Sequence, residues 1–117
     1  MIIVESLGRS ECSEDVKHNY YYRLTKNEIK LNQEDDNVGV QAYGIEVERQ
    51  DVSNGTLVGI ERDSIRCISP HRHKVHILLK LMHDNMVSPI HLVDILGEYV
   101  DDNISDFDIY NNNIATI

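Results

Sequence analysis

The apolar residues of this chain follow two different spacings, one in each half of the sequence. In the first half they alternate with polar residues, most clearly around Tyr43, Ile45 and Val47, which are separated by glycine or glutamate. Alternation with a period of two is typical of a β-strand that buries one face. This pattern predicts strands at about residues 2–5, 19–24, 38–49, 56–61 and 65–68.

The segments between these strands contain residues that turns prefer. Asn54-Gly55 tolerates the positive φ angles of a tight hairpin, so it should join two antiparallel strands. Ser69-Pro70 should end the β region, because proline cannot donate a hydrogen bond to a neighbouring strand. We expect loops or turns at residues 6–18, 32–37 and 62–64, while 25–31 fits either a short strand or an irregular arm.

The second half has the period of an α-helix. One apolar row lies at i, i+3, i+4, i+7 and i+11 and predicts a helix over about residues 71–84. This row consists of Val75, Leu78, Leu79, Met82 and Met86. Ser88 and Pro89 suit the N-cap and first position of a second helix over about residues 88–101, in which Gly97 reflects either a close approach or chance. The apolar stripe of that helix consists of Leu92, Ile95, Leu96 and Tyr99.

Together these patterns predict the α+β class, with an antiparallel sheet of three or four strands followed by two C-terminal helices packed on one face. The chain has 117 residues, which suits one domain over residues 1–102 and an acidic, asparagine-rich tail over residues 103–117. The helix stripes need an apolar partner. We expect the inward face of the sheet to supply it through Tyr22, Tyr43, Ile45, Val47, Ile60, Ile65 and Cys67.

Composition narrows the possible functions. The chain is 41% hydrophobic and 26% charged, which is too apolar for general disorder. Its formal net charge of −9 favours solubility and opposes binding to nucleic acid or anionic lipid, so a protein partner fits better. No stretch reaches the roughly 18 apolar residues of a membrane span. The first residues lack the pattern of a signal peptide, and we therefore expect a cytoplasmic protein.

The two cysteines have unlike surroundings and show no metal or redox spacing. Cys12 lies in a polar stretch, whereas Cys67 lies in an apolar alternation and should be a buried strand residue. We expect both to be reduced thiols. The chain has no nucleophile-elbow, phosphate-loop or zinc-protease motif, so an enzyme is disfavoured and no cofactor is expected. A small hydrolase that uses Cys12 with a histidine is the weakest hypothesis.

Five of the six histidines lie between residues 71 and 91. Neutral imidazole is a good ligand for zinc and nickel. On a helix, His73, His76 and His83 would project from one side, with His71 as a further candidate ligand. Lys80 projects from that same side and no carboxylate or cysteine lies at ligand spacing, so a solvated face is the simpler interpretation. A metal-binding or metal-responsive protein that uses zinc or nickel is our alternative hypothesis.

The chain is acidic overall, but the same helix carries a local cluster of positive charges. Arg72, Lys74 and Lys80 form a basic patch that could meet an acidic partner protein. The acidic residues of the second helix oppose the use of this patch to bind nucleic acid. Plain helix solubility is a simpler explanation of the patch than a partner.

The tail contains scattered apolar residues without a clean period. Asp106 and Asp108 alternate with Phe107 and Ile109, a pattern that can add as a strand to an exposed sheet edge. We expect Phe107 and Ile109 to dock on this protein's own sheet or on that of a second copy, with Tyr110 as a further contact residue. A disordered acidic terminus is the equal alternative.

Three segments carry a resemblance to a known family. They are Tyr43-Gly44-Ile45-Glu46-Val47, then Ile65-Arg66-Cys67-Ile68-Ser69-Pro70, then residues 87–100 with Ser88-Pro89 at their start. In order and spacing they resemble a family of short uncharacterised proteins from spore-forming anaerobic Firmicutes, over residues 19–101. The resemblance implies a bacterial, cytoplasmic, single-domain protein and brings no activity, cofactor or catalytic residue.

The leading hypothesis is therefore a non-enzymatic regulator or adaptor that acts through protein–protein contact, with a homodimer as one form of that contact. Its basis is the lack of catalytic motifs together with exposed sheet edges and an apolar tail.

Overall fold

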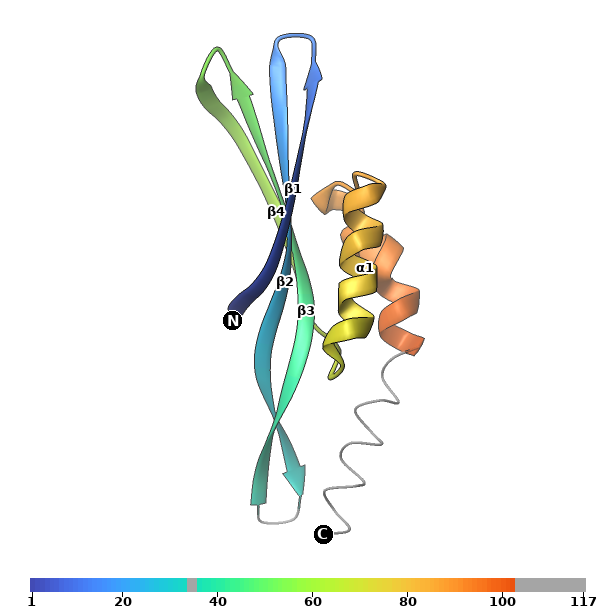
Figure 1. The fold of residues 1–117 in the computed structure, drawn as a ribbon. Helices are drawn as coiled ribbons and strands as arrows, with labels where there is room; N and C mark the ends of the chain where they lie inside the picture. The colour runs from blue at the N-terminus through green and yellow to red at the C-terminus, as the bar shows by residue number, and fades with distance from the viewer. Residues whose placement is uncertain (34–35, 103–117) are drawn as a thin grey trace.

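The computed structural model describes residues 1–33 and 36–102, with the backbone alone for residues 31–33 and 36–38. Four antiparallel strands form one open sheet in the order β1-β2-β3-β4, so each strand pairs with the next one along the chain. Two helices follow and cover one face of the sheet (Figure 1). This arrangement confirms the predicted α+β class. The elements are β1 (Ile2–Ser13), β2 (Val16–Gln33), β3 (Asp36–Ser53), β4 (Thr56–Ser69), α1 (Arg72–Asp84), the 3-10 turn η1 (Pro89–His91) and a second α-helix over residues 92–102.

The strands are longer than the alternation of apolar residues predicted. β1 continues through the polar residues 6–13, β2 runs through residues 25–31, and β4 passes through residues 62–64, where we expected a turn. Strand pairing also continues into both ends of the loop expected at 32–37, through the pairs Asn32–Asn37 and Gln33–Asp36. Hydrogen bonds between backbones hold these parts, and such pairing needs no apolar side chain where no helix covers the sheet.

Two turns of the described residues lie at one end of the long sheet. Asn54 and Gly55 have φ angles of 52° and 77°, the positive values predicted for a tight hairpin. Glu14, in the turn between β1 and β2, also has a positive φ, of 55°. At the opposite end β2 and β3 extend as a two-stranded arm, because the pairing of β1 begins opposite Lys26 and that of β4 ends opposite Tyr43 (Figure 1).

A bulge near the end of β4 breaks the regular pairing with β3. Between the pairs Ile45–Ile65 and Tyr43–Ser69, β4 has two more residues than β3. The extra backbone lies beside Gly44, where any Cβ would overlap the carbonyl oxygen of Ile65. Glycine is required here because β4 comes this close.

Two predictions for the inward face of the sheet, at Cys67 and Ile60, were wrong. Cys67 is exposed and Ile68 is buried in its place, because the alternation of faces holds only while the register is unbroken. Ile60 is also exposed. It pairs with Gln50 and lies five residues from Ile65 along an unbroken register, so alternation places it on the opposite face of the sheet from Ile65.

The core lies between the helices and the middle of the sheet. It confirms the predicted inward positions of Tyr22, Ile45 and Val47, which are buried, while Tyr43 and Ile65 are partly buried and pack against the core. It also confirms the stripe of α1, whose buried members are Val75, Leu78, Leu79 and Met82.

Hydrogen bonds from the sheet fix the end of α1 and the connection after it. Arg9 of β1 donates to the carbonyl oxygens of His83 at 2.9 Å and Asp84 at 3.2 Å, so its charge lies at the negative end of the helix dipole. The buried Tyr22 hydroxyl donates to the carbonyl of Val87 at 2.9 Å. Burial raises the pKa of Tyr22 above its usual range, so this donor stays protonated.

The helices begin close to their predicted positions. α1 starts at Arg72, and Pro89 opens η1 after an extended Ser88, although the Ser88 side chain makes no capping hydrogen bond. A Cβ on Gly97 would have no neighbour within 4 Å, so a close approach does not explain this glycine. Within the described residues, no helix has the length and apolar character needed to cross a membrane.

Candidate functional site

The helix pair turns apolar side chains outward as well as inward. Ile77, Leu81, Ile95 and Tyr99 keep between 36% and 64% of their surface exposed. Ile77 and Leu81 are spaced i, i+4, as are Ile95 and Tyr99, so each pair lies on one side of its helix. Leu81 and Ile95 line the same pocket, so these two rows flank the junction between the helices. We call these four residues the helix seam.

The helix seam corrects the predicted stripe of the second helix. Leu92 and Leu96 are fully buried, as expected, but Ile95 and Tyr99 are exposed. The stripe was too wide, because the sheet and α1 together cover only part of the circumference of this helix. The sequence contains a signal that the prediction did not use. Each helix has a second pair of apolar residues at i, i+4, namely Ile77 and Leu81 in the first and Ile95 and Tyr99 in the second.

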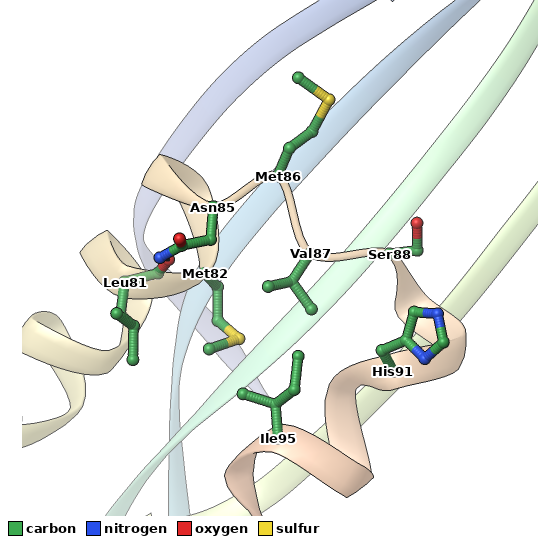
Figure 2. A pocket seen from close by; sticks show the side chains of 8 residues that line it. All are labelled: Leu81, Met82, Asn85, Met86, Val87, Ser88, His91 and Ile95. Atoms are coloured by element: carbon green, nitrogen blue, oxygen red, sulfur yellow. The ribbon is translucent and has the colours of Figure 1, made fainter.

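A groove with a volume of about 410 Å³ opens at one end of the helix seam, where α1 meets the second helix (Figure 2). A pocket of this size and mainly apolar lining can accept an apolar side chain or a small apolar ligand. Its walls combine five apolar residues with three polar ones, namely Leu81, Met82, Met86, Val87 and Ile95 with Asn85, Ser88 and His91.

The way α1 ends shapes this groove. The Val87 N–H donates to the Met82 carbonyl at 3.0 Å and the Met86 N–H donates to the His83 carbonyl at 3.2 Å, which together form a Schellman motif. Met86 therefore has a left-handed φ of 48°, in a position where glycine is the usual residue. Its side chain packs against the edge of the core, which compensates for the strained backbone.

The face of the sheet that points away from the helices is charged. Strand alternation places Glu46 and Glu48 there, because Ile45 and Val47 point towards the helices. Glu48 is only 2% exposed, yet three side chains bind it. Arg62 donates to it through Nε at 2.8 Å, Gln50 at 3.0 Å and Arg23 at 3.3 Å, and Arg23 also donates to Glu46 at 2.8 Å. We call this network the far-face network.

The far-face network favours the ionised form of Glu48. Burial by itself raises the pKa of Glu48, but hydrogen bonds from Arg62, Gln50 and Arg23 outweigh that effect and hold the pKa below its usual range. The pKa of Asp51 shows the same balance. Burial raises it, but His18 and the Arg49 guanidinium lower it by more, so the pKa lies below its usual range. Carboxylates held in the charged form are poorly suited to act as general acids.

A second hollow, of about 530 Å³, lies at the start of α1. It brings together His71, His73 and His76, three of the four predicted metal ligands, with Arg72 from the predicted basic patch. Glu5 of β1 also lines it and pairs internally: its carboxylate lies 2.8 Å from His76 Nδ1 and 3.9 Å from Arg72 Nε.

His83 lies at the other end of α1 and does not join these histidines. It is seven residues from His76, which corresponds to about 10 Å along a helix axis. Its ring packs edge-on against Tyr22, with 5.9 Å between the ring centroids, and its Nδ1 lies 2.9 Å from Asp84 Oδ1. In the part of the chain that the structure describes, no three His, Cys, Asp or Glu side chains are grouped to hold a metal ion.

The predicted basic residues point in different directions. Helical spacing places Lys74 in the row of Ile77 and Leu81, at i, i+3 and i+7. Lys80 Nζ lies 3.8 Å from Asp84 Oδ1, and Arg72 donates to the Val4 carbonyl at 3.4 Å. The other predicted contact residues, Phe107, Ile109 and Tyr110, lie outside the described residues.

Cys12 is exposed and pairs across the β1–β2 hairpin with Lys17. The adjacent His18 is paired with Glu11 and therefore points to the opposite face of the sheet. The hairpin thus places the nearest histidine in sequence on the side away from the Cys12 thiol.

The fold and the helix seam define a small α+β domain, in which an open antiparallel sheet carries a helix pair with an apolar outer side. The chain belongs to a family of unknown function, DUF6514, which matches residues 1–102. The match includes the N-terminal 18 residues, which the resemblance noted from the sequence had left out. No curated protein and no solved structure is detectably similar to the chain.

Proposed function

We propose that this protein is a non-enzymatic regulator or adaptor that acts through protein–protein contact, and that the helix seam is its contact surface. One observation carries the proposal: four apolar side chains line the outer junction of the helix pair and lead into a groove of about 410 Å³. A row of exposed apolar residues beside a pocket is typical of an interaction site, whereas single exposed ones are not.

The chemistry of the surface suggests the kind of partner. Two i, i+4 rows with a groove at one end suit an amphipathic helix that inserts an apolar side chain into the groove. The charged residues of the second helix are all acidic, namely Asp94, Glu98, Asp101 and Asp102. A partner helix with Lys or Arg beside its apolar face is therefore the best match. A cytoplasmic location, an origin in spore-forming anaerobic Firmicutes and a homodimeric form belong to the same proposal.

A photo-crosslinking amino acid at Leu81 of the full-length protein tests this proposal in the source cells. Leu57 is the matched control, because it is an exposed leucine on β4 and not on either helix. We expect one protein to crosslink to position 81 and not to position 57. The purified partner should then bind the Leu81→Asp variant at least tenfold more weakly than the Leu57→Asp variant. Equal crosslinking at both positions, or equal affinity of both variants, would refute the proposed surface.

The metal-binding alternative has narrower support. The hollow at the start of α1 gathers His71, His73 and His76, but the Glu5 carboxylate beside them already pairs with His76 and lies near Arg72. Titration of untagged protein with zinc and with nickel, in parallel with the His73→Ala variant, tests it. Loss of stoichiometric binding in the variant would support a metal-responsive role, whereas absence of binding to the unaltered protein would end it.

A further inference from the structure

The chain leaves the helix pair at the end of the helix seam opposite to the groove. The second helix runs antiparallel to α1, so its last residues lie beside the first residues of α1 (Figure 1). Ile77 and Tyr99 are the seam residues nearest to this end, and Leu81 and Ile95 line the groove at the other. Residues 103–117 therefore start at one end of an exposed apolar row.

This segment is long enough to cover that row. The fifteen residues would span about 22 Å as a helix and up to about 50 Å when extended. The second helix, over residues 92–102, is only about 16 Å long by the same rise per residue. Either conformation lets the segment turn back and reach the groove.

The segment has an apolar face that fits the helix seam. Although it has no clean period as a whole, Phe107, Tyr110, Ile114 and Ile117 are spaced i, i+3, i+7 and i+10. On a helix these four residues form one row, and Ile109 lies well outside it. A third helix with such a row can pack into the junction between two others.

The sheet edges are poorer sites for this segment than we expected from the sequence. The outer edge strand β4 has bulges at both ends of its paired region, and the charged residues 61–63 lie between them. The opposite edge, β1, is interrupted between Ile3 and Glu5. Bulges and charges at an edge impede the addition of another strand.

Of the two helices that border the seam, only α1 carries Lys or Arg, so charge favours the α1 side of the seam for this acidic segment. α1 carries Arg72, Lys74 and Lys80 against a single acid, Asp84, whereas residues 103–117 carry Asp106 and Asp108 and no Lys or Arg. An acidic segment on an acidic protein gains most beside its basic helix.

We infer that residues 103–117 bind along the helix seam of the same molecule, with Phe107, Tyr110, Ile114 and Ile117 against it. The segment then occupies the surface that the proposed function assigns to a partner, so the partner must displace it. The docking itself does not depend on that function, and it can be tested on the purified protein alone.

A photo-crosslinking amino acid in place of Phe107 in the full-length chain maps the docking site. We expect crosslinks within one molecule to peptides of residues 72–84 and 92–102. A mixture of isotope-labelled and unlabelled protein separates these from crosslinks between two copies. Crosslinks to residues 38–68, crosslinks between copies, or no crosslink at all would each overturn the inference.

A matched pair of substitutions tests the helical row. Ile114→Asp places a charge in the row, and Ile109→Asp places the same charge outside it. We expect Ile114→Asp to raise the amide exchange rates of residues 95–102 at least tenfold and Ile109→Asp to leave them within twofold of the unaltered protein. Equal effects of the two variants, or no effect of Ile114→Asp, would contradict the proposed packing.

The two proposals can fail separately. If position 107 fails to crosslink to the helices while position 81 still captures a partner, the docking is wrong and the contact surface stands. If position 107 crosslinks to the helices and position 81 captures no other protein, the segment covers the seam without the proposed partner.

Discussion

On the outer face of the sheet, Glu48 is 2% exposed beneath Arg23, Arg62 and Gln50, whereas on the outer side of the helix pair Ile77 stays 64% exposed. The first surface is polar and its groups bind one another. The second is apolar and leaves a groove open beside it. Both lie opposite the same core, so burial of that core does not explain the difference between them.

The comparison shows which surface retains unmet binding capacity. The carboxylates of the far-face network already accept hydrogen bonds, so a partner would gain little from them and would have to compete with internal donors. The exposed apolar surface of the helix seam becomes more stable when another apolar surface covers it, because that area is then removed from water. The helix side is therefore the better candidate for binding.

The largest effect is expected from a charge in the shared core. Ile45→Asp and Leu92→Asp should each unfold the protein, because both side chains are fully buried and an aspartate there has no partner. Circular dichroism and urea denaturation measure this. Ile77→Asp, on the helix seam, is the control and should change the free energy of unfolding by less than about 1 kcal/mol. Native-like spectra for both core variants would refute the packing of helices on sheet.

The next effect concerns the close approach of β4 to Gly44. Gly44→Ala should lower the free energy of unfolding by about 2 kcal/mol or more, because the new methyl group would overlap the backbone of Ile65 and Arg66. Gly8→Ala is the matched control, since its Cβ would make an ordinary contact at 3.6 Å with the Tyr20 carbonyl oxygen. Equal stability of the two variants in urea would show that the bulge in β4 is not rigid.

The far-face network should respond unequally to loss of its two arginines. Arg23→Ala leaves Glu46 and Glu48 short of donors and should cost about 2 kcal/mol. Arg62→Ala should cost less than about 1 kcal/mol, because the Arg62 side chain is 55% exposed and solvent screens its bond to Glu48. Urea denaturation of both variants at low and high salt measures the difference. A larger loss of unfolding free energy in Arg62→Ala than in Arg23→Ala would show that Arg62, and not Arg23, is the main stabilising partner of Glu48.

The same network predicts a pH dependence. The pKa of Glu48 in the folded protein lies below its ordinary value of 4.5, so the folded state favours the ionised form. The resulting stability is fully present above that ordinary value and is lost as pH falls through the lower pKa of the folded state. In Glu48→Gln the decrease in unfolding free energy below about pH 4.5 should be shallower. Parallel pH profiles for the two proteins would contradict the lowered pKa.

The smallest effect is a gain on the helix side. Gly97→Ala should raise the free energy of unfolding by about 0.5–1 kcal/mol, because alanine favours the helix and its Cβ would meet no neighbour within 4 Å. Thermal denaturation can detect such a change. A loss of stability would reveal a contact at this position that the described residues do not make.

The sequence by itself determined the elements whose signals are local. The period of the α1 stripe, the turn at Asn54-Gly55 and the break at Ser69-Pro70 all depend on neighbouring residues, and each appears where predicted. The same is true of the inward positions of Ile45 and Val47, because alternation along an unbroken strand decides them. These features together were enough for the α+β class.

Only the tertiary structure decided the rest, since it depends on pairs of residues that are distant in the chain. The polar part of β1 is a strand because β2 pairs with it, and the bulge near the end of β4 decided that Cys67 faces solvent. Likewise, the spacing of apolar residues in the second helix predicted that Ile95 and Tyr99 would be buried. They are exposed because α1 and the sheet cover only part of this helix. The helix seam is visible only once the helices are packed, because a hydrophobic pattern states what a residue prefers and not whether a neighbour covers it.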